Sequence, residues 1–114
     1  MTRRLAALAV GIVILAGACS PSSPEPPVGS DGQTDPVLSI GREVYQSSCV
    51  QCHGGDGGGG RGPKLSDGVV VEAYPNIADE IAVVANGKGG MPAFSDKLTE
   101  TQIEAVVRYT REVL

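Results

Sequence analysis

Two thiols and an imidazole stand within five residues near the middle of the chain, in the string Cys49-Val50-Gln51-Cys52-His53. Residues three apart lie on nearly the same side of a helical turn, so both thiols can point toward one ligand. They could add to the two vinyl groups of one porphyrin, and the adjacent imidazole could bind its iron as an axial ligand. This string is typical of covalent attachment of a c-type haem. We therefore expect one haem c, held through Cys49 and Cys52.

Other uses of these residues compete with haem attachment. A redox disulfide between Cys49 and Cys52 normally comes with a βαβ pattern, and none is visible around the pair. A zinc site usually has four nitrogen or sulfur ligands. Here His53 is the single histidine, and the third thiol, Cys19, belongs to a different part of the chain. Chance occurrence is the remaining alternative, and haem attachment is favoured over all three.

The composition favours a small domain built around a large apolar body. The chain has 114 residues, with one Phe, three Tyr and no Trp. Such a sequence can form one domain with only a thin core, and a buried porphyrin would fill that deficit. The formal charge of −4 argues against a nucleic acid as partner.

The N-terminus has the pattern of an export signal, predicted over residues 1–18. Arg3 and Arg4 precede an apolar run, residues 5–18, that is shorter than the roughly 20 residues of a membrane-spanning helix. The end of this run before Cys19 resembles the lipobox of bacterial lipoproteins, with Ala16 where leucine is usual; it also fits ordinary cleavage after small residues. Acylation of Cys19 is favoured because it accounts for an odd cysteine in an exported chain. A cleaved, soluble periplasmic protein remains the alternative.

Residues 19–35 are predicted to carry the lipidated cysteine and a flexible linker. Four prolines lie among serine, glycine and acidic residues, so this stretch should be disordered or extended, with a reach of at most roughly 50 Å. Removal of residues 1–18 takes away two arginines and no acids, which leaves 7 basic and 13 acidic residues and a charge of −6. This acidity favours solubility, or docking to a redox partner with a basic patch.

The folded part is predicted to span residues 36–114 and to begin and end with a helix. Asp35 as N-cap and Pro36 after it start the first helix. Glycine in a helix costs about 1 kcal/mol relative to alanine, so Gly41 on the apolar stripe of this helix indicates that another helix crosses closely there. The closing helix, which begins with a capping box of Thr99 and Gln102, is the expected partner.

Between these helices the sequence is less regular. Residues 54–60 are rich in glycine and should form a pliable loop, without the lysine that a phosphate-binding loop requires. A short helix is predicted over residues 77–86, capped by Asn76 and closed by Gly87. Residues 69–71 are three valines with no obvious strand partner, and they are predicted to be loop.

These features together resemble the class I c-type cytochromes, in particular the short bacterial monohaem kind. The resemblance covers residues 36–114 and implies an all-α fold of short helices wrapped around one covalently bound haem, with the first and last helices crossing at near right angles. The matching positions are Gly41, Tyr45, the haem motif with Gly54, the run Gly62-Pro63-Lys64-Leu65, the run Gly90-Met91-Pro92-Ala93-Phe94, and Tyr109.

The resemblance also implies the iron ligands. His53 would be the proximal ligand, with its second ring nitrogen donating to the carbonyl of Pro63, and Met91 would be the distal ligand. The position of Met91 between a glycine pair and a proline, away from any helical stripe, favours a ligand over a gap-filling core methionine. A thioether ligand favours reduced iron and raises the potential. The candidates for contacts with the haem propionates are Arg61, Lys64 and Tyr74.

A haem with both axial positions filled has no open site for a substrate. We therefore expect electron transfer and not catalysis: a monohaem cytochrome that carries single electrons between respiratory protein partners, at the periplasmic or extracytoplasmic face of the membrane. No catalytic residue and no small-molecule substrate are expected. Two alternatives stay open, namely a haem sensor or peroxide-reactive enzyme with an open sixth position, and a haem subunit of a larger oxidoreductase complex.

Overall fold

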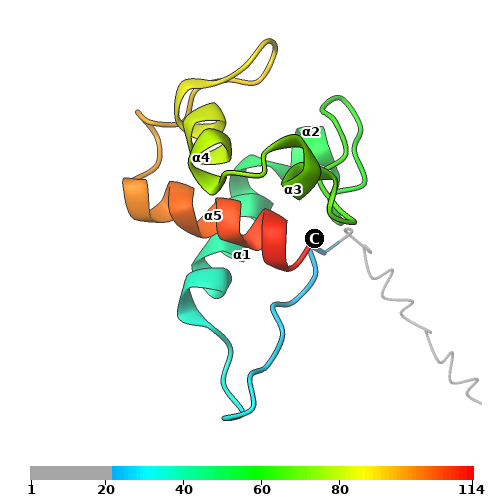
Figure 1. Cartoon of the computed structure of the whole chain (residues 1–114), viewed down its shortest axis with the longest axis vertical. Helices are drawn as coiled ribbons and strands as arrows, with labels where there is room; N and C mark the ends of the chain where they lie inside the picture. Colours follow the sequence, from blue (N-terminus) through cyan, green and yellow to red (C-terminus); the bar gives the residue numbers. More distant parts are fainter. Residues whose placement is uncertain (1–21) are drawn as a thin grey trace, which may run out of the picture.

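The computed structural model describes residues 22–114, and this part of the chain is helical without a strand (Figure 1). The predicted all-α class is confirmed. The predicted signal peptide and Cys19 lie outside the described residues. Within residues 22–114, no helix is both long enough and apolar enough to cross a membrane. The helices are α1 (Pro36–Ser48), α2 (Val50–His53), α3 (Val69–Ala73), α4 (Ile77–Asn86) and α5 (Glu100–Glu112).

The two long helices, α1 and α5, start at the predicted caps. The Asp35 carboxylate accepts a hydrogen bond from the Val37 N–H at 2.8 Å and pairs with Arg108 of α5 at 2.9 Å. The Val37 N–H and then the Arg108 guanidinium hold the pKa of this carboxyl below its usual range. At the start of α5, Thr99 and Gln102 form a complete capping box. Both helix starts are therefore fixed by local hydrogen bonds.

Gly41 lies where α1 crosses α5, as its place on the apolar stripe predicted. A Cβ atom built on Gly41 would overlap the Ala105 carbonyl oxygen and lie 2.7 Å from the Tyr109 Cβ. In Figure 1, α5 runs across α1, with α4 above them and α2 and α3 to one side. The close approach is possible because residue 41 has no side chain.

The core at this crossing is small and is tied to the loop after the haem motif. Val44 and Tyr45 of α1 pack against Val106 and Tyr109 of α5, with the two tyrosine rings 5.5 Å apart. The Tyr45 hydroxyl donates to the carbonyl of Gly54 at 2.7 Å. Since Gly54 directly follows the motif, the core fixes the position of α2.

Residues 22–26, called the strap below, lie against the helices, whereas residues 27–34 form a turn that projects from them (Figure 1). The flexible linker predicted for residues 19–35 therefore differs from the structure over the strap. Arg42 donates to the carbonyl of Ser23 at 3.0 Å and pairs with Glu25 at 2.7 Å, and the Tyr109 hydroxyl donates to the carbonyl of Pro24 at 2.6 Å. The strap has few apolar side chains, but its backbone carbonyls accept from donors that the folded helices present.

A second prediction was wrong at the three valines. Val69–Ala73 forms one turn of helix, α3, and not a loop. Gly68 precedes it with a φ of 78°, which glycine adopts without strain. Val70 is buried and contributes to the wall of the pocket described below. Burial of this side chain against α5 outweighs the preference of valine for strands, which is weak and depends on context.

The helix predicted over residues 77–86 is present as α4, with both of its ends as expected. The Asn76 side chain accepts from the Ala78 N–H at 3.1 Å, and Gly87 ends the helix with a φ of 78°. The chain after α4 folds back on it, since the Phe94 N–H donates to the carbonyl of Val84 at 3.1 Å. This return fixes the loop that carries Met91.

Candidate cofactor-binding site

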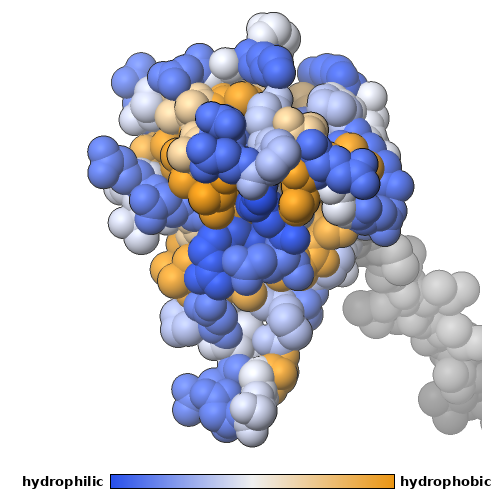
Figure 2. All heavy atoms as spheres, viewed as in Figure 1, coloured by the Kyte–Doolittle hydropathy of each residue, from blue (hydrophilic) through white to orange (hydrophobic). Residues whose placement is uncertain are grey.

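A cavity of about 390 Å³ lies between the helices, and every helix contributes to its wall. Its lining is largely apolar, with valines of α3, α4 and α5 on one side. Figure 2 shows hydrophilic side chains over most of one face of the molecule, with hydrophobic atoms in patches between them. A large apolar cavity with a few polar groups is the usual form of a cofactor site.

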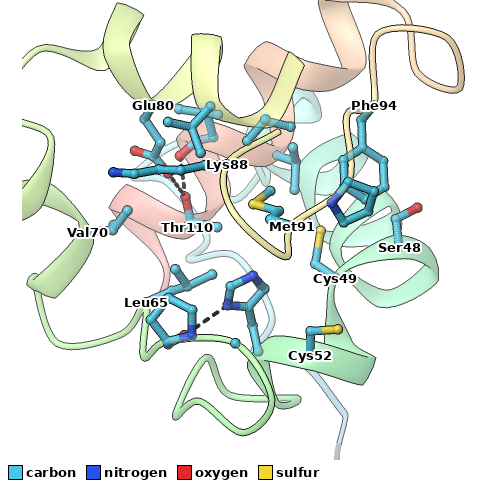
Figure 3. Close-up of a pocket in the computed structure, with 18 of the residues that line it drawn as sticks. Ser48, Cys49, Cys52, Leu65, Val70, Glu80, Lys88, Met91, Phe94 and Thr110 are labelled. Atoms are coloured by element: carbon cyan, nitrogen blue, oxygen red, sulfur yellow. Dashed lines mark hydrogen bonds between the residues drawn. The ribbon is translucent and has the colours of Figure 1, made fainter. Parts of the chain in front are cut away.

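Cys49 and Cys52 stand on one side of this cavity, with α1 ending directly before them. Figure 3 shows both side chains on the same wall, Cys49 above Cys52. Both line the cavity, and they do not form a disulfide with each other. Burial, followed by the neighbouring Cys52, raises the pKa of the Cys49 thiol to about 11. Before haem attachment, this thiol is therefore protonated at neutral pH.

One ring nitrogen of His53 forms a hydrogen bond that holds the side chain in place. The residue is only 7% exposed, and Nδ1 lies 2.8 Å from the carbonyl oxygen of Pro63. Because a carbonyl oxygen only accepts, Nδ1 carries the proton and donates it. The lone pair is then on Nε2, the nitrogen that could bind a metal, and this arrangement fixes the ring orientation of a metal-bound histidine.

The glycine-rich loop brings Pro63 to His53. The Gly59 N–H donates to the carbonyl of His53 at 2.8 Å, and the Gly62 N–H donates to the carbonyl of Cys52 at 2.7 Å. A Cβ atom on Gly62 would lie 2.8 Å from the His53 Cε1 atom, so a side chain there would press on the imidazole. The pliable loop predicted from the sequence is thus a compact turn that supports the histidine.

Met91 reaches the same cavity from the loop after α4. Its backbone N–H donates to the carbonyl of Lys88 at 3.0 Å, and its carbonyl accepts from the Lys88 N–H at 3.2 Å. A Cβ atom on Gly87 would lie 2.6 Å from the Met91 carbonyl oxygen, so this tight loop requires glycine. In Figure 3 the Met91 side chain extends into the cavity. Its thioether is therefore available to an iron in the pocket.

The candidates for propionate contacts do not all reach the cavity. Arg61 and Tyr74 line it, together with Lys88, whose ammonium group donates to the Tyr74 hydroxyl at 2.9 Å. Lys64 instead pairs with Asp67 at 2.7 Å, which also keeps the pKa of that carboxyl below its usual range. Lys64 is not among the residues that line the cavity.

Glu80 is a pocket residue that sequence reasoning missed. It lies on α4 and lines the cavity, although its side chain is a buried acid in a largely apolar wall. The signal was present in the spacing, because Glu80 is three and four residues before Val83 and Val84, which face the same cavity.

The comparison with protein families decides the identity of this site. Residues 36–109 match the family model described as "Cytochrome C oxidase, cbb3-type, subunit III". The chain belongs to this family of c-type cytochromes. Cys49 and Cys52 bind one covalently attached haem c, and the protein is an electron-carrying monohaem cytochrome and not an enzyme.

Individual relatives and solved structures agree with the family. Cytochrome c-551 of Bacillus subtilis is 36% identical over 95 residues, 81% of this chain and 82% of that protein. Chloroplastic cytochrome c6 of Chlamydomonas reinhardtii is 31% identical over 107 residues, 90% of this chain but 64% of that protein. The structure of cytochrome c6 from the diatom Phaeodactylum tricornutum superposes with a TM-score of 0.55 at 26% identity, over 64% of this chain and 88% of that one. These structures are class I c-type cytochromes, as the sequence predicted.

Proposed function

We propose that this cytochrome carries single electrons between respiratory protein partners outside the cytoplasm, with its haem iron bound between His53 and Met91. The observation that carries the proposal is the hydrogen bond from the His53 Nδ1 to the Pro63 carbonyl, which leaves Nε2 free in the cavity that Met91 also enters. A bound haem supplies one-electron chemistry at its iron. The chain would supply the two thiols, His53 and Met91 as iron ligands, and a largely apolar wall around the haem.

Two filled axial positions suit electron transfer because the coordination of the iron does not change between its oxidation states. Met91 would also exclude water and exogenous ligands from the iron, and its soft sulfur would favour the reduced state. The hydrogen bond to Pro63 would keep the His53 ring in one orientation through each redox cycle. The rigid turns around both residues support this role.

We also propose that cleavage before Cys19 and acylation of this cysteine hold the protein at the extracytoplasmic face of the membrane. Arg3, Arg4 and the apolar run over residues 5–18 support an export signal, and an odd cysteine directly after small residues supports acylation. The charge of −6 after cleavage supports docking to a partner with a basic patch. A cleaved and soluble periplasmic form is the alternative location.

The function is tested by replacing Met91 with alanine. We expect the reduced wild type not to bind carbon monoxide, whereas Met91→Ala should bind it readily. The potential of the variant should fall, because water or hydroxide would replace the sulfur in the oxidised form and favour oxidised iron. Carbon monoxide difference spectra and potentiometry on both proteins measure these changes. Ready binding of carbon monoxide by the wild type would instead favour a sensor or a peroxide-reactive enzyme.

The description of the matching family favours a second candidate, a haem subunit of a larger oxidoreductase complex. In such a complex this domain would pass electrons within a stable assembly. Purification from native membranes after mild solubilisation distinguishes the two functions. Isolation of the cytochrome in a stoichiometric complex would support the subunit, and isolation as a monomer would support the mobile carrier.

A further inference from the structure

Glu80 is a buried acid in the wall of the haem pocket, and both of its carboxyl oxygens have partners. Glu80 as a whole is 5% exposed. Oε1 lies 2.7 Å from the Thr110 hydroxyl, and Oε2 accepts from the Arg111 guanidinium at 3.0 Å. A buried acid usually costs several kcal/mol unless it is paired or protonated. The two partners on α5 are therefore what allows Glu80 to exist at this place in either charge state.

The Thr110 hydroxyl is placed so that it can serve both charge states of Glu80. It has one proton but lies close to two acceptors, Oε1 of Glu80 at 2.7 Å and the carbonyl of Val107 at 2.8 Å. When Glu80 is ionised, the hydroxyl donates to Oε1. When Glu80 is protonated, its own O–H donates to the threonine oxygen, and the hydroxyl proton turns to Val107. Neither state leaves an unpaired polar group, so the site can take up and release a proton without rearrangement of the backbone.

Glu80 shares a low-dielectric cavity with the haem. It lies with Thr110 and Lys88 on the wall across from Cys49 and Cys52 (Figure 3). A unit charge in such a cavity acts strongly on another, because little water screens the pair. Since reduction removes one positive charge from the haem, the ionised form of a nearby acid becomes less favourable in the reduced protein.

We propose that Glu80 binds a proton when the haem is reduced and releases it when the haem is oxidised, so that the potential of this cytochrome falls as pH rises. One electron enters from a donor protein, and one proton from solvent binds the Glu80 carboxylate. The net charge of the pocket is then unchanged. On oxidation by the acceptor, the electron and the proton leave again. This inference rests on the proposed electron-carrying function but not on Met91 as ligand, so the carbon monoxide experiment and the pH experiment can fail separately.

Burial and the charged groups around Glu80 act on its titration in opposite directions. Burial raises the pKa of Glu80, while the hydrogen bonds from Thr110 and Arg111 and the charge of Arg111 oppose this rise, and the net direction is upward. The remaining charged or titratable side chains that line the cavity are Arg61, Tyr74, Lys88, His53 and the two haem-binding cysteines, Cys49 and Cys52. The proton exchange is thus expected above the usual glutamate value of about 4.3.

Potentiometry of the haem-loaded protein from about pH 4 to about pH 9 tests the proposal. Between the Glu80 pKa values of the oxidised and reduced forms, the redox equilibrium constant should change by up to tenfold per pH unit, or about 59 mV for one electron. Glu80→Gln should remove this slope and raise the potential at high pH, because it removes a negative charge. Asp79→Asn, on the exposed neighbour of Glu80 in α4, should behave like wild type. A slope that persists in Glu80→Gln would assign the proton to the haem propionates and overturn the proposal.

Two further measurements keep the proposal testable if Glu80→Gln does not fold. Thr110→Val removes the hydroxyl with little change of shape, so the ionised acid loses a donor and the sloping region should move to higher pH. The wild type itself can be followed by infrared difference spectra between its oxidised and reduced forms, with ¹³C-labelled glutamate. A carboxylic acid band of glutamate should appear on reduction within the sloping region. Absence of that band, or an unmoved slope in Thr110→Val, would overturn the proposal.

Discussion

Replacement of Gly41 by alanine would force apart the two helices that form the core. The added methyl group would overlap the Ala105 carbonyl oxygen and lie 2.7 Å from both the Ala105 carbonyl carbon and the Tyr109 Cβ. Carbon atoms in contact normally stay about 3.5–4.0 Å apart. Since the atoms in the way are backbone and Cβ atoms, no rotamer change relieves the overlap. Helices α1 and α5 would have to separate by about 1 Å.

The magnitude follows from two opposing effects. Overpacking of a well-packed interface costs about 1–3 kcal/mol, and a clash with backbone on a small core should lie at the upper end. Alanine offsets about 1 kcal/mol of this through its better helix propensity. The expected net loss is about 2 kcal/mol, which lowers the melting temperature by roughly 8–16 °C for a domain of this size. Leucine at the same position should be severely destabilising.

Thermal unfolding of the haem-loaded protein, followed by far-ultraviolet circular dichroism, measures this loss. Gln46→Ala is the matched control, because Gln46 lies on the exposed side of the same helix. It should unfold within about 0.5 kcal/mol of wild type. If Gly41→Ala melts at or above the wild-type temperature, helix propensity has outweighed the clash, and the close crossing does not constrain residue 41.

Three further changes test separate parts of the molecule. In the wild type, haem should stay attached to the protein during extraction with acid organic solvent. Cys49→Ser or Cys52→Ser should weaken or abolish that attachment. Full extraction of the wild-type pigment would contradict thioether bonds. Cys19→Ser should release the protein from membranes or block its processing, since acyl chains contribute about 0.8 kcal/mol of membrane-binding free energy per buried CH₂. If the variant fractionates with membranes as the wild type does, the lipid anchor is contradicted. Tyr109→Phe removes the hydrogen bond to the Pro24 carbonyl; it should cost about 1 kcal/mol by denaturant unfolding, and hydrogen exchange in the strap should increase.

The helix starts could be predicted from the sequence because local residues determine them. Asp35, Asn76 and the capping box at Thr99 each accept from an N–H two or three residues away. The contact between the Pro63 carbonyl and His53 spans ten residues, and it was expected only from the resemblance to class I c-type cytochromes. The crossing of α1 and α5 at Gly41 could also be predicted, since a glycine on the apolar stripe of a helix has few other physical explanations.

The features that could not be predicted depend on contacts between distant segments. Three valines favour a strand in isolation, and α3 forms because Val70 is buried beside α5. The role of Glu80 was missed, because its burial depends on contacts with Thr110 and Arg111, some thirty residues further along the chain. No local pattern shows that two such side chains will present one proton donor to each carboxyl oxygen.

The strap changes the expected behaviour of a lipid anchor. A free linker over residues 19–35 would let the domain swing far above the membrane, whereas the docked strap places Ser23 and Pro24 against Arg42 and Tyr109. Only three residues then separate Cys19 from Ser23. Fully extended, this stretch spans at most about 14 Å. If Cys19 is acylated as proposed, the domain is held close to the membrane surface, and its redox partners must present their own electron-transfer sites at the same height.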